Sequence, residues 1–285
     1  MISDISVMQN LKNLQRLNVA NNKLQNISAV QCLQELLFLD ASFNQISDLS
    51  PVYGLNNLIE LVVEGNCIKS IEPVQQLKQL SRLCCSSNPI QTDLLQNIQQ
   101  VIQLQLQNVC NNTNYLLCLR QFINIQVLDI SQNNLDDISM LEKLVNLEQL
   151  DVSDNQISSL NSLSQLTNLM WLDASNNLLE DILGLEDIIN DLSYLNLTGN
   201  KMNMYDLICR NKQLLVNSLC SLNLSSIPLS KKDFKMIIKF TSLKSLILSL
   251  VVKQVTIHLL TIKNFKKLKQ VLIIKITQTY MNFQI

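Results

Sequence analysis

Glycine and proline are scarce in this chain, with four of each among 285 residues. Compact folds with many tight turns use these residues at their corners, because glycine adopts backbone angles that other residues avoid and proline presets a turn. Hydrophobic residues make up 47% of the chain, which is enough to bury a large core. Another residue type must therefore form the turns.

Long apolar stretches are also missing. The stretch from Ser245 to Val252 is ended by Lys253 and is far shorter than the roughly 20 residues that a membrane helix needs. The opening residues, MISDISVMQN, contain no basic segment followed by an apolar run. We therefore expect no membrane span and no secretory signal, and we predict a location in the cytoplasm or nucleus.

Residues that carry catalysis or bind metals show no recognisable pattern. The single histidine, His258, lies in an alternating apolar stretch and is expected to pack. The eight cysteines show no C-x-x-C pair, and no HExxH, GxSxG or glycine-rich phosphate loop occurs. We predict no enzyme activity, no metal site and no cofactor. Cys84 falls at an outward position, where a reactive thiol is the alternative to a packing role.

Charge is divided unevenly along the chain. Residues 1–230 hold 11 Lys and Arg against 22 Asp and Glu, whereas residues 231–285 hold 11 Lys against Asp233 alone. Because the basic tail interleaves its lysines with apolar residues, it is expected to be a cap with a solvated lysine face rather than a nucleic-acid site. The acidic part predicts a partner with a basic or mixed surface.

A repeat of 22 residues organises most of the sequence. The pattern L-x-x-L-x-[VA]-x-x-N-x-[LI] starts at Leu14 and recurs at Leu36, Leu58, Leu80, Ile125, Leu147 and Leu169. Looser copies start near Val101, Leu192, Leu219, Leu243 and Leu268. About a dozen copies fill the chain.

Each copy predicts one layer of a stack. The L-x-x-L-x-[VA] segment alternates apolar and polar residues, which is typical of a strand with one buried face. An asparagine follows at a fixed offset in most copies, where its amide can bond the backbone of the bend and of the next copy. This asparagine replaces glycine as the turn former. Apolar residues in steps of three then predict a tight 3₁₀ or extended turn on the back.

The motif LxxLxVxxNxIxxI with its 22-residue period resembles a leucine-rich repeat solenoid. The resemblance implies an α/β solenoid in the shape of a horseshoe or arc, with a parallel sheet on the concave face and longer helices toward the C-terminus. We predict a solenoid over residues 1–242, with regular repeats in 14–79 and 125–190, irregular repeats in 80–124 and longer repeats in 192–242. Residues 243–285 are predicted to be degenerate basic repeats or a cap. Helical spacing from Thr92 predicts a local bend or an added helix on the back.

Two groups within that superfamily are similar to this chain. The short period resembles the leucine-rich-repeat regulatory subunits of type-one protein phosphatase, which are intracellular and bind their partner through acidic and aromatic residues of the concave face. The stretch NQISDLSPVYGLNNL resembles the repeat region of internalins, which are surface adhesins. The first resemblance implies a regulatory subunit. The second implies a secreted or cell-surface adhesin, and a fragment of a larger leucine-rich repeat protein is a further alternative.

The outward strand positions are the candidates for binding, because the inward ones pack in the core. Aspartates recur there on three successive strands, at Asp129, Asp151 and Asp173, beside Trp171 and Tyr194. Asp and Ser satisfying one another across strands is one reading of this ladder, and a hard cation is another. We predict instead a protein-binding patch, because stacked carboxylates repel and aromatic side chains are favoured anchors. The full set of predicted contacts is Phe38, Asp40, Glu60, Asp129, Gln149, Asp151, Trp171, Asp173, Tyr194 and Asn196.

Overall fold

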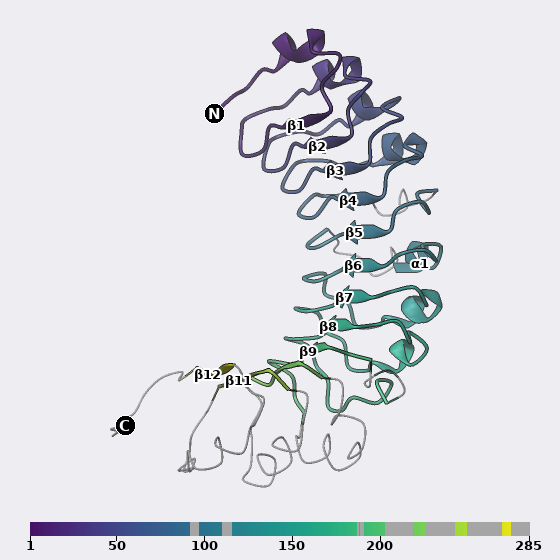
Figure 1. The fold of residues 1–285 in the computed structure, drawn as a ribbon, viewed down its shortest axis with the longest axis vertical. Helices are drawn as coiled ribbons and strands as arrows, with labels where there is room; N and C mark the ends of the chain where they lie inside the picture. Colours follow the sequence, from purple (N-terminus) through teal and green to yellow (C-terminus); the bar gives the residue numbers. More distant parts are fainter. Residues whose placement is uncertain are drawn as a thin grey trace, which may run out of the picture.

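Twelve short strands form one parallel sheet in chain order, from β1 to β12, within the residues that the computed structural model describes. These residues are 1–91, 97–109, 116–186, 188, 191–202, 219–225, 243–249 and 270–274. Figure 1 shows the strands stacked along an arc, with the helical turns on its outer, convex side. The predicted leucine-rich repeat arc with a parallel concave sheet is confirmed.

The strands fall where the repeated leucines predict them. Ten of them have three residues, and the last two have five. They are β1 Arg16–Asn18, β2 Phe38–Asp40, β3 Glu60–Val62, β4 Arg82–Cys84, β5 Gln103–Gln105, β6 Val127–Asp129, β7 Gln149–Asp151, β8 Trp171–Asp173, β9 Tyr194–Asn196, β10 Ser221–Asn223, β11 Ser245–Ser249 and β12 Gln270–Ile274.

Equivalent residues of successive repeats are paired in register from β1 to β11. The central leucine of each strand lies opposite the next, as Leu39 does with Leu61. Both of these side chains are fully buried, and the same holds for Leu36, Leu58 and Val63 around them. One repeat buries too little apolar surface to be stable alone, so the stack shares one continuous core.

Short 3₁₀ helices cover the convex side of most repeats in the described part of the chain. A 3₁₀ helix has three residues per turn, so apolar residues spaced three apart lie on one side of it, and this side packs inward. They are η1 Ser6–Asn10, η2 Ser28–Cys32, η3 Ser50–Val52, η4 Glu72–Gln76, η7 Ser139–Lys143 and η8 Asn161–Leu163. The predicted short turns on the back are thereby confirmed. One α-helical turn, α1 Leu116–Leu119, is added within the irregular region.

The repeated asparagine joins each layer to the one before it. The Asn44 amide donates to the carbonyls of Val19, Ala41 and Ser42 at 3.0–3.1 Å. Its Oδ1 accepts from the backbone N–H of Leu24 at 2.9 Å. The predicted bonds to its own bend are confirmed, but the second repeat is the preceding one and not the next as predicted. One buried side chain thus satisfies backbone groups of two repeats.

The residue before the asparagine position, which Val109 occupies in the fifth repeat, has a positive φ in every repeat from the first to the ninth strand. Left-handed backbone at this corner turns the chain away from the sheet, and only two of these residues are glycine. They are Asn21, Phe43, Gly65, Ser87, Asn108, Gln132, Asp154, Asn176 and Gly199.

The irregular region shows what happens when the asparagine is lost. Val109 takes its place. In other repeats the N–H equivalent to that of Ile90 donates to the asparagine oxygen, whereas the Ile90 N–H donates to the nearby carbonyl of Asn88 at 2.9 Å. Asn133 of the following repeat reaches back and accepts from the Val109 N–H at 3.0 Å. The helical spacing from Thr92 does not give a helix over the described residues 97–102, which turn directly into β5.

Other predictions for the C-terminal part fall on residues that the structure does not describe. The longer helices expected toward the C-terminus would lie in 203–218 and 226–242, outside the described residues. The division at residue 242 and the cap over 243–285 therefore stay predictions.

Candidate functional site

Two columns of side chains run along the concave face, one from each outward position of the strands. In one column Gln149 lies opposite Trp171, and Trp171 opposite Tyr194. In the other, Asp129 lies opposite Asp151. The same registers continue the second column through Asp173 to Asn196. The structure thus brings the predicted residues of β6 to β9 onto one continuous surface.

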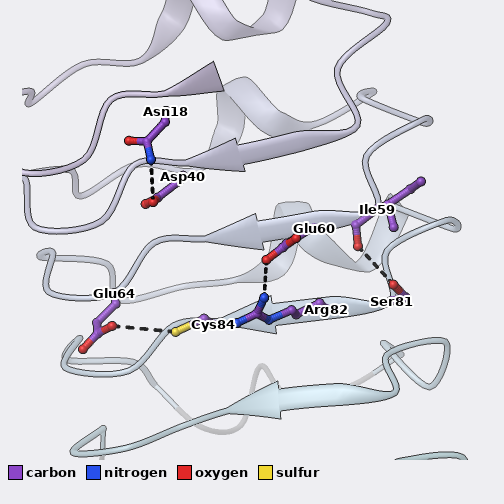
Figure 2. Close-up of polar contacts among 8 residues, drawn as sticks. All are labelled: Asn18, Asp40, Ile59, Glu60, Glu64, Ser81, Arg82 and Cys84. Atoms are coloured by element: carbon purple, nitrogen blue, oxygen red, sulfur yellow. Dashed lines mark hydrogen bonds and ion pairs between the residues drawn. The ribbon is translucent and has the colours of Figure 1, made fainter. Parts of the chain in front are cut away.

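In the N-terminal half of this face, several outward side chains contact one another. The Asn18 amide donates to Asp40 Oδ2 at 3.1 Å, and Arg82 is paired with Glu60 at 2.5 Å. Both contacts are drawn in Figure 2. The guanidinium carbon of Arg16 lies 4.2 Å from the centre of the Phe38 ring. The predicted contacts Phe38, Asp40 and Glu60 are therefore engaged within the chain.

The aspartates in the middle of the face bond within their own repeats. The Oδ1 of Asp151 accepts from the backbone N–H of Ser153 at 2.9 Å and from its hydroxyl at 2.6 Å. Asp129 and Asp173 make the same pair of bonds to the serines two residues after them. The expected Asp–Ser pairing is therefore confirmed, but it lies within each repeat and not across strands, because the serine side chain turns back to its own aspartate.

The second oxygens of these carboxylates differ in their partners. Asp173 Oδ2 accepts from the amide of Asn196 at 2.7 Å. The Oδ2 atoms of Asp129 and Asp151 have no hydrogen-bond partner among the described residues. No Lys or Arg forms an ion pair with any of the three, since the described part of the chain holds a single salt bridge, between Arg82 and Glu60. This leaves two carboxylate oxygens of the concave face without a hydrogen-bond partner in the described part of the chain.

Asp151, in the centre, has the most perturbed acidity. Burial raises its pKa to about 6, the charges of Asp129 and Asp173 add to the rise, and the bonds from Ser153 oppose it. The effect is physical: desolvation and like charges both disfavour the ionised carboxylate. A cation at this position would stabilise the charged form.

Two aromatic rings stand beside the carboxylates. Trp171 and Tyr194 stack with their ring centroids 4.8 Å apart and an angle of 8° between the planes. Burial raises the pKa of the Tyr194 hydroxyl, with smaller contributions from the charges of Asp173 and Asp151. The sequence predicted that these rings lie on adjacent strands, and the structure adds that they are parallel. We call Asp129, Asp151, Trp171, Asp173 and Tyr194 the acidic–aromatic strip.

Two predicted outward residues are largely covered. Asn196 is 8% exposed, and its amide is used by Asp173. Cys84 is 4% exposed, with its Sγ 4.0 Å from Glu64 (Figure 2). Burial raises the pKa of the Cys84 thiol, which reduces its thiolate fraction, so the reactive-thiol alternative is wrong.

Arg16 and Arg82 shape the N-terminal half of the face, although they were not among the predicted contacts. The repeat register of the sequence could have identified both arginines. Arg16 occupies the position one repeat before Phe38, and Arg82 the position one repeat after Glu60. Opposite-charge and cation–aromatic neighbours at a 22-residue spacing could have been paired from the repeat alone.

Within the described ranges, no group of three or more His, Cys, Asp or Glu side chains is placed to hold a metal ion. None of the helices in those ranges has both the length and the apolar character needed to cross a membrane. What the face presents is a solvent-facing sheet with carboxylates and stacked rings.

Comparison with known proteins agrees with the fold. A family model described as leucine-rich repeats (2 copies) matches residues 123–165, which include β6 and β7. No curated protein matches the chain by sequence. The match identifies leucine-rich repeats in this segment, and the other described residues share the leucine-rich repeat fold.

Solved structures with the same fold come from bacteria and plants. An internalin (InlF) from Listeria monocytogenes is 21% identical, with 93% of this chain and 88% of that chain covered and a TM-score of 0.57. A leucine-rich repeat protein of Leptospira interrogans is 23% identical, with 87% and 57% covered and a TM-score of 0.64. The plant peptide hormone receptor RGFR1, in complex with RGF2, is 17% identical, with 94% and 48% covered and a TM-score of 0.59. The predicted likeness to internalins is confirmed for the fold, and that to phosphatase regulatory subunits stays a prediction.

Proposed function

We propose that this chain is a non-catalytic scaffold that binds another protein through the acidic–aromatic strip on its concave face. The observation that carries the proposal is the row of Asp129, Asp151 and Asp173 on successive strands, without a cation paired to them in the described part of the chain. Strands in a sheet are about 4.8 Å apart, so these carboxylates repel one another. A basic group of a partner relieves that repulsion.

The stacked rings supply the second element of a binding surface. Trp171 and Tyr194 are each partly exposed, and their mutual stacking holds both in one orientation. Rigid aromatic side chains give a large contact area at a small loss of rotamer entropy, which is why they dominate protein interfaces. A partner with a basic or mixed surface therefore fits the strip, and a regulatory-subunit role is part of this proposal.

A capture experiment with matched variants tests the proposal. The first variant carries Asp129→Asn, Asp151→Asn and Asp173→Asn, and the second carries Trp171→Ala and Tyr194→Ala. Asparagine preserves the local bonds, because Asn196 and Asn223 accept from Thr198 and Ser225 in the same way at this position. The fold should therefore survive, and circular dichroism checks that it does.

The control removes three negative charges outside the strands, through Asp136→Asn, Glu142→Gln and Glu180→Gln. All three side chains are exposed. We expect a protein captured by the intact chain and by the control, and lost with both strip variants. Capture of the same proteins by all four chains would reject the strip as the binding surface.

An adhesin is the second candidate, and the shared fold with an internalin is the observation that favours it. We keep the cytoplasm or nucleus as the proposed location, supported by the exposed thiol of Cys67, since exposed free cysteines are typical of reducing compartments. Cell fractionation with surface labelling separates the two. Labelling of the chain on intact cells would establish the adhesin and overturn the intracellular location.

A further inference from the structure

Aromatic side chains occupy the same column of the concave face at two places. Phe38 on β2 lies opposite Arg16 of the preceding strand, and Trp171 on β8 lies opposite Gln149 of the preceding strand. At the first place the chain fills the position itself, because the Arg16 guanidinium lies over the Phe38 ring at 4.2 Å. The two places therefore share a geometry and differ in whether a cation is present.

One face of the Trp171 ring has no aromatic ring or cation stacked on it among the described residues. Its other face is covered by Tyr194, which belongs to the following strand and stacks in parallel. The second face is consequently turned toward β7, where the neighbouring side chain is the exposed Gln149. This is the side on which Arg16 approaches Phe38 in the first repeat.

A carboxylate stands next to the open position. Asp151 follows Gln149 by two residues on the same strand and points to the same face of the sheet. Its Oδ1 is occupied by Ser153, while its Oδ2 has no hydrogen-bond partner among the described residues. A planar guanidinium that stacks on Trp171 can donate to that oxygen with its edge. A lysine ammonium has no plane to stack and no fork of donors.

We infer that the strip receives an arginine of the partner protein, with its guanidinium stacked on the open face of Trp171 and its N–H groups donating to Asp151. This inference rests on the proposed function, because it names the group through which the partner is bound. The partner's arginine takes the place, relative to Trp171, that Arg16 takes relative to Phe38.

The test uses the fluorescence of Trp171, which is the single tryptophan of the chain. The probes are two blocked tripeptides, acetyl-Gly-Arg-Gly-amide and acetyl-Gly-Lys-Gly-amide, neither of which absorbs at the excitation wavelength of tryptophan. We expect the arginine peptide to change the Trp171 emission in a saturable manner. The lysine peptide should bind about tenfold more weakly, because it lacks the stacking and bidentate contacts.

A variant that supplies the arginine in cis gives the sharper measurement. Gln149→Arg reproduces the pair of Arg16 and Phe38 at Trp171, and we expect it to block the arginine peptide. Gln103→Arg adds the same residue to the same column on β5, opposite Val127 rather than an aromatic ring. This control should bind the peptide as the intact chain does, with circular dichroism confirming the fold of both.

Each outcome separates the inference from the function on which it rests. Equal binding of the two peptides, or unchanged binding by Gln149→Arg, overturns the arginine while capture through the strip still supports a protein partner. If the strip variants capture the same proteins as their control, the protein-binding proposal is overturned instead. Blocked binding by Gln149→Arg alone, with preference for the arginine peptide, supports the inference.

Discussion

The ionised carboxylate of Asp151 destabilises the folded chain, although it is the form that a basic partner would bind. Its pKa of about 6 in the folded chain exceeds the ordinary value of 3.8, mainly because of burial. The folded state therefore holds its proton more tightly than the unfolded state does. The stability from this group is fully present below the unfolded pKa and is lost as the pH rises through about 6.

Replacing this residue should reveal that loss directly. We expect Asp151→Asn to raise the free energy of unfolding by about 1 kcal/mol at a pH of about 7.5, where the carboxylate is ionised, after allowance for solvent screening. At a pH of about 3, below the unfolded pKa, the gain should disappear. Urea unfolding at both pH values measures it, with the exposed Asp136→Asn as control. A gain or loss of equal size at both values would contradict the linkage.

The asparagine of each repeat carries much of the layer-to-layer bonding. Asn155 accepts from the N–H groups of Asn133 and Leu135, and its amide donates to three carbonyls of its own and the preceding repeat. Removing a buried side chain of this kind leaves backbone groups without partners in the core.

We expect Asn155→Ala to lower the free energy of unfolding by about 3 kcal/mol or more, because each unsatisfied buried group costs about 1–3 kcal/mol. Asn124→Ala, at an exposed turn, should change it little. Urea unfolding followed by circular dichroism compares the two variants. Similar losses at both positions would mean that the bonds seen at Asn155 contribute no specific stability.

At the scale of the structural element, the corner after each strand is the most constrained feature. Phe43 has a φ of 52° there and is 50% exposed, whereas other repeats place Asn, Asp, Ser, Gln or Gly at this point. Bulky side chains are rare in left-handed backbone. Its ring lies against Gly65 of the next repeat, where an added Cβ would be 2.6 Å from the ring.

Two substitutions test this corner. Phe43→Asn should raise the free energy of unfolding by about 0.5–1 kcal/mol, because asparagine adopts left-handed backbone more easily. Gly65→Ala should lower it by about 1–2 kcal/mol through its φ of 64° and the contact with the ring. The loss should be smaller when Phe43→Asn is already present. Additive effects in the double variant would show that the two residues do not contact each other.

The elements themselves were largely predictable from the sequence. The leucine spacing located every strand from β1 to β10, because only one face of a short strand can be buried and its period is two. The turn around α1 was not predicted, since Leu116–Leu119 lies in the copy that lacks the asparagine and has no periodic pattern to guide it. Cys84 was misplaced because the alternation places it outward, whereas its side chain is 4% exposed and lies against Glu64 of the preceding repeat.

At the scale of the whole molecule, the arc determines which residues of distant repeats share a surface. Repeat spacing was enough to place Asp129, Asp151 and Asp173 in one column and Trp171 beside Tyr194. It could not show that each aspartate bonds its own serine or that the rings are parallel, because rotamers depend on packing in three dimensions. The pairing of Arg16 with Phe38 follows from the register and was missed. These side-chain details separate the satisfied half of the face from the half proposed to bind.

The most direct measurement labels Trp171, the single tryptophan, with 5-fluorotryptophan and follows its fluorine resonance by NMR in the full chain while the captured partner is added. Because this ring lies in the middle of the strip, binding through the concave face should shift or broaden the resonance in proportion to the complex formed. The control variant with Asp136→Asn, Glu142→Gln and Glu180→Gln should respond in the same way. An unchanged resonance in a chain that co-elutes with its partner would contradict binding at the strip and place the contact elsewhere on the solenoid.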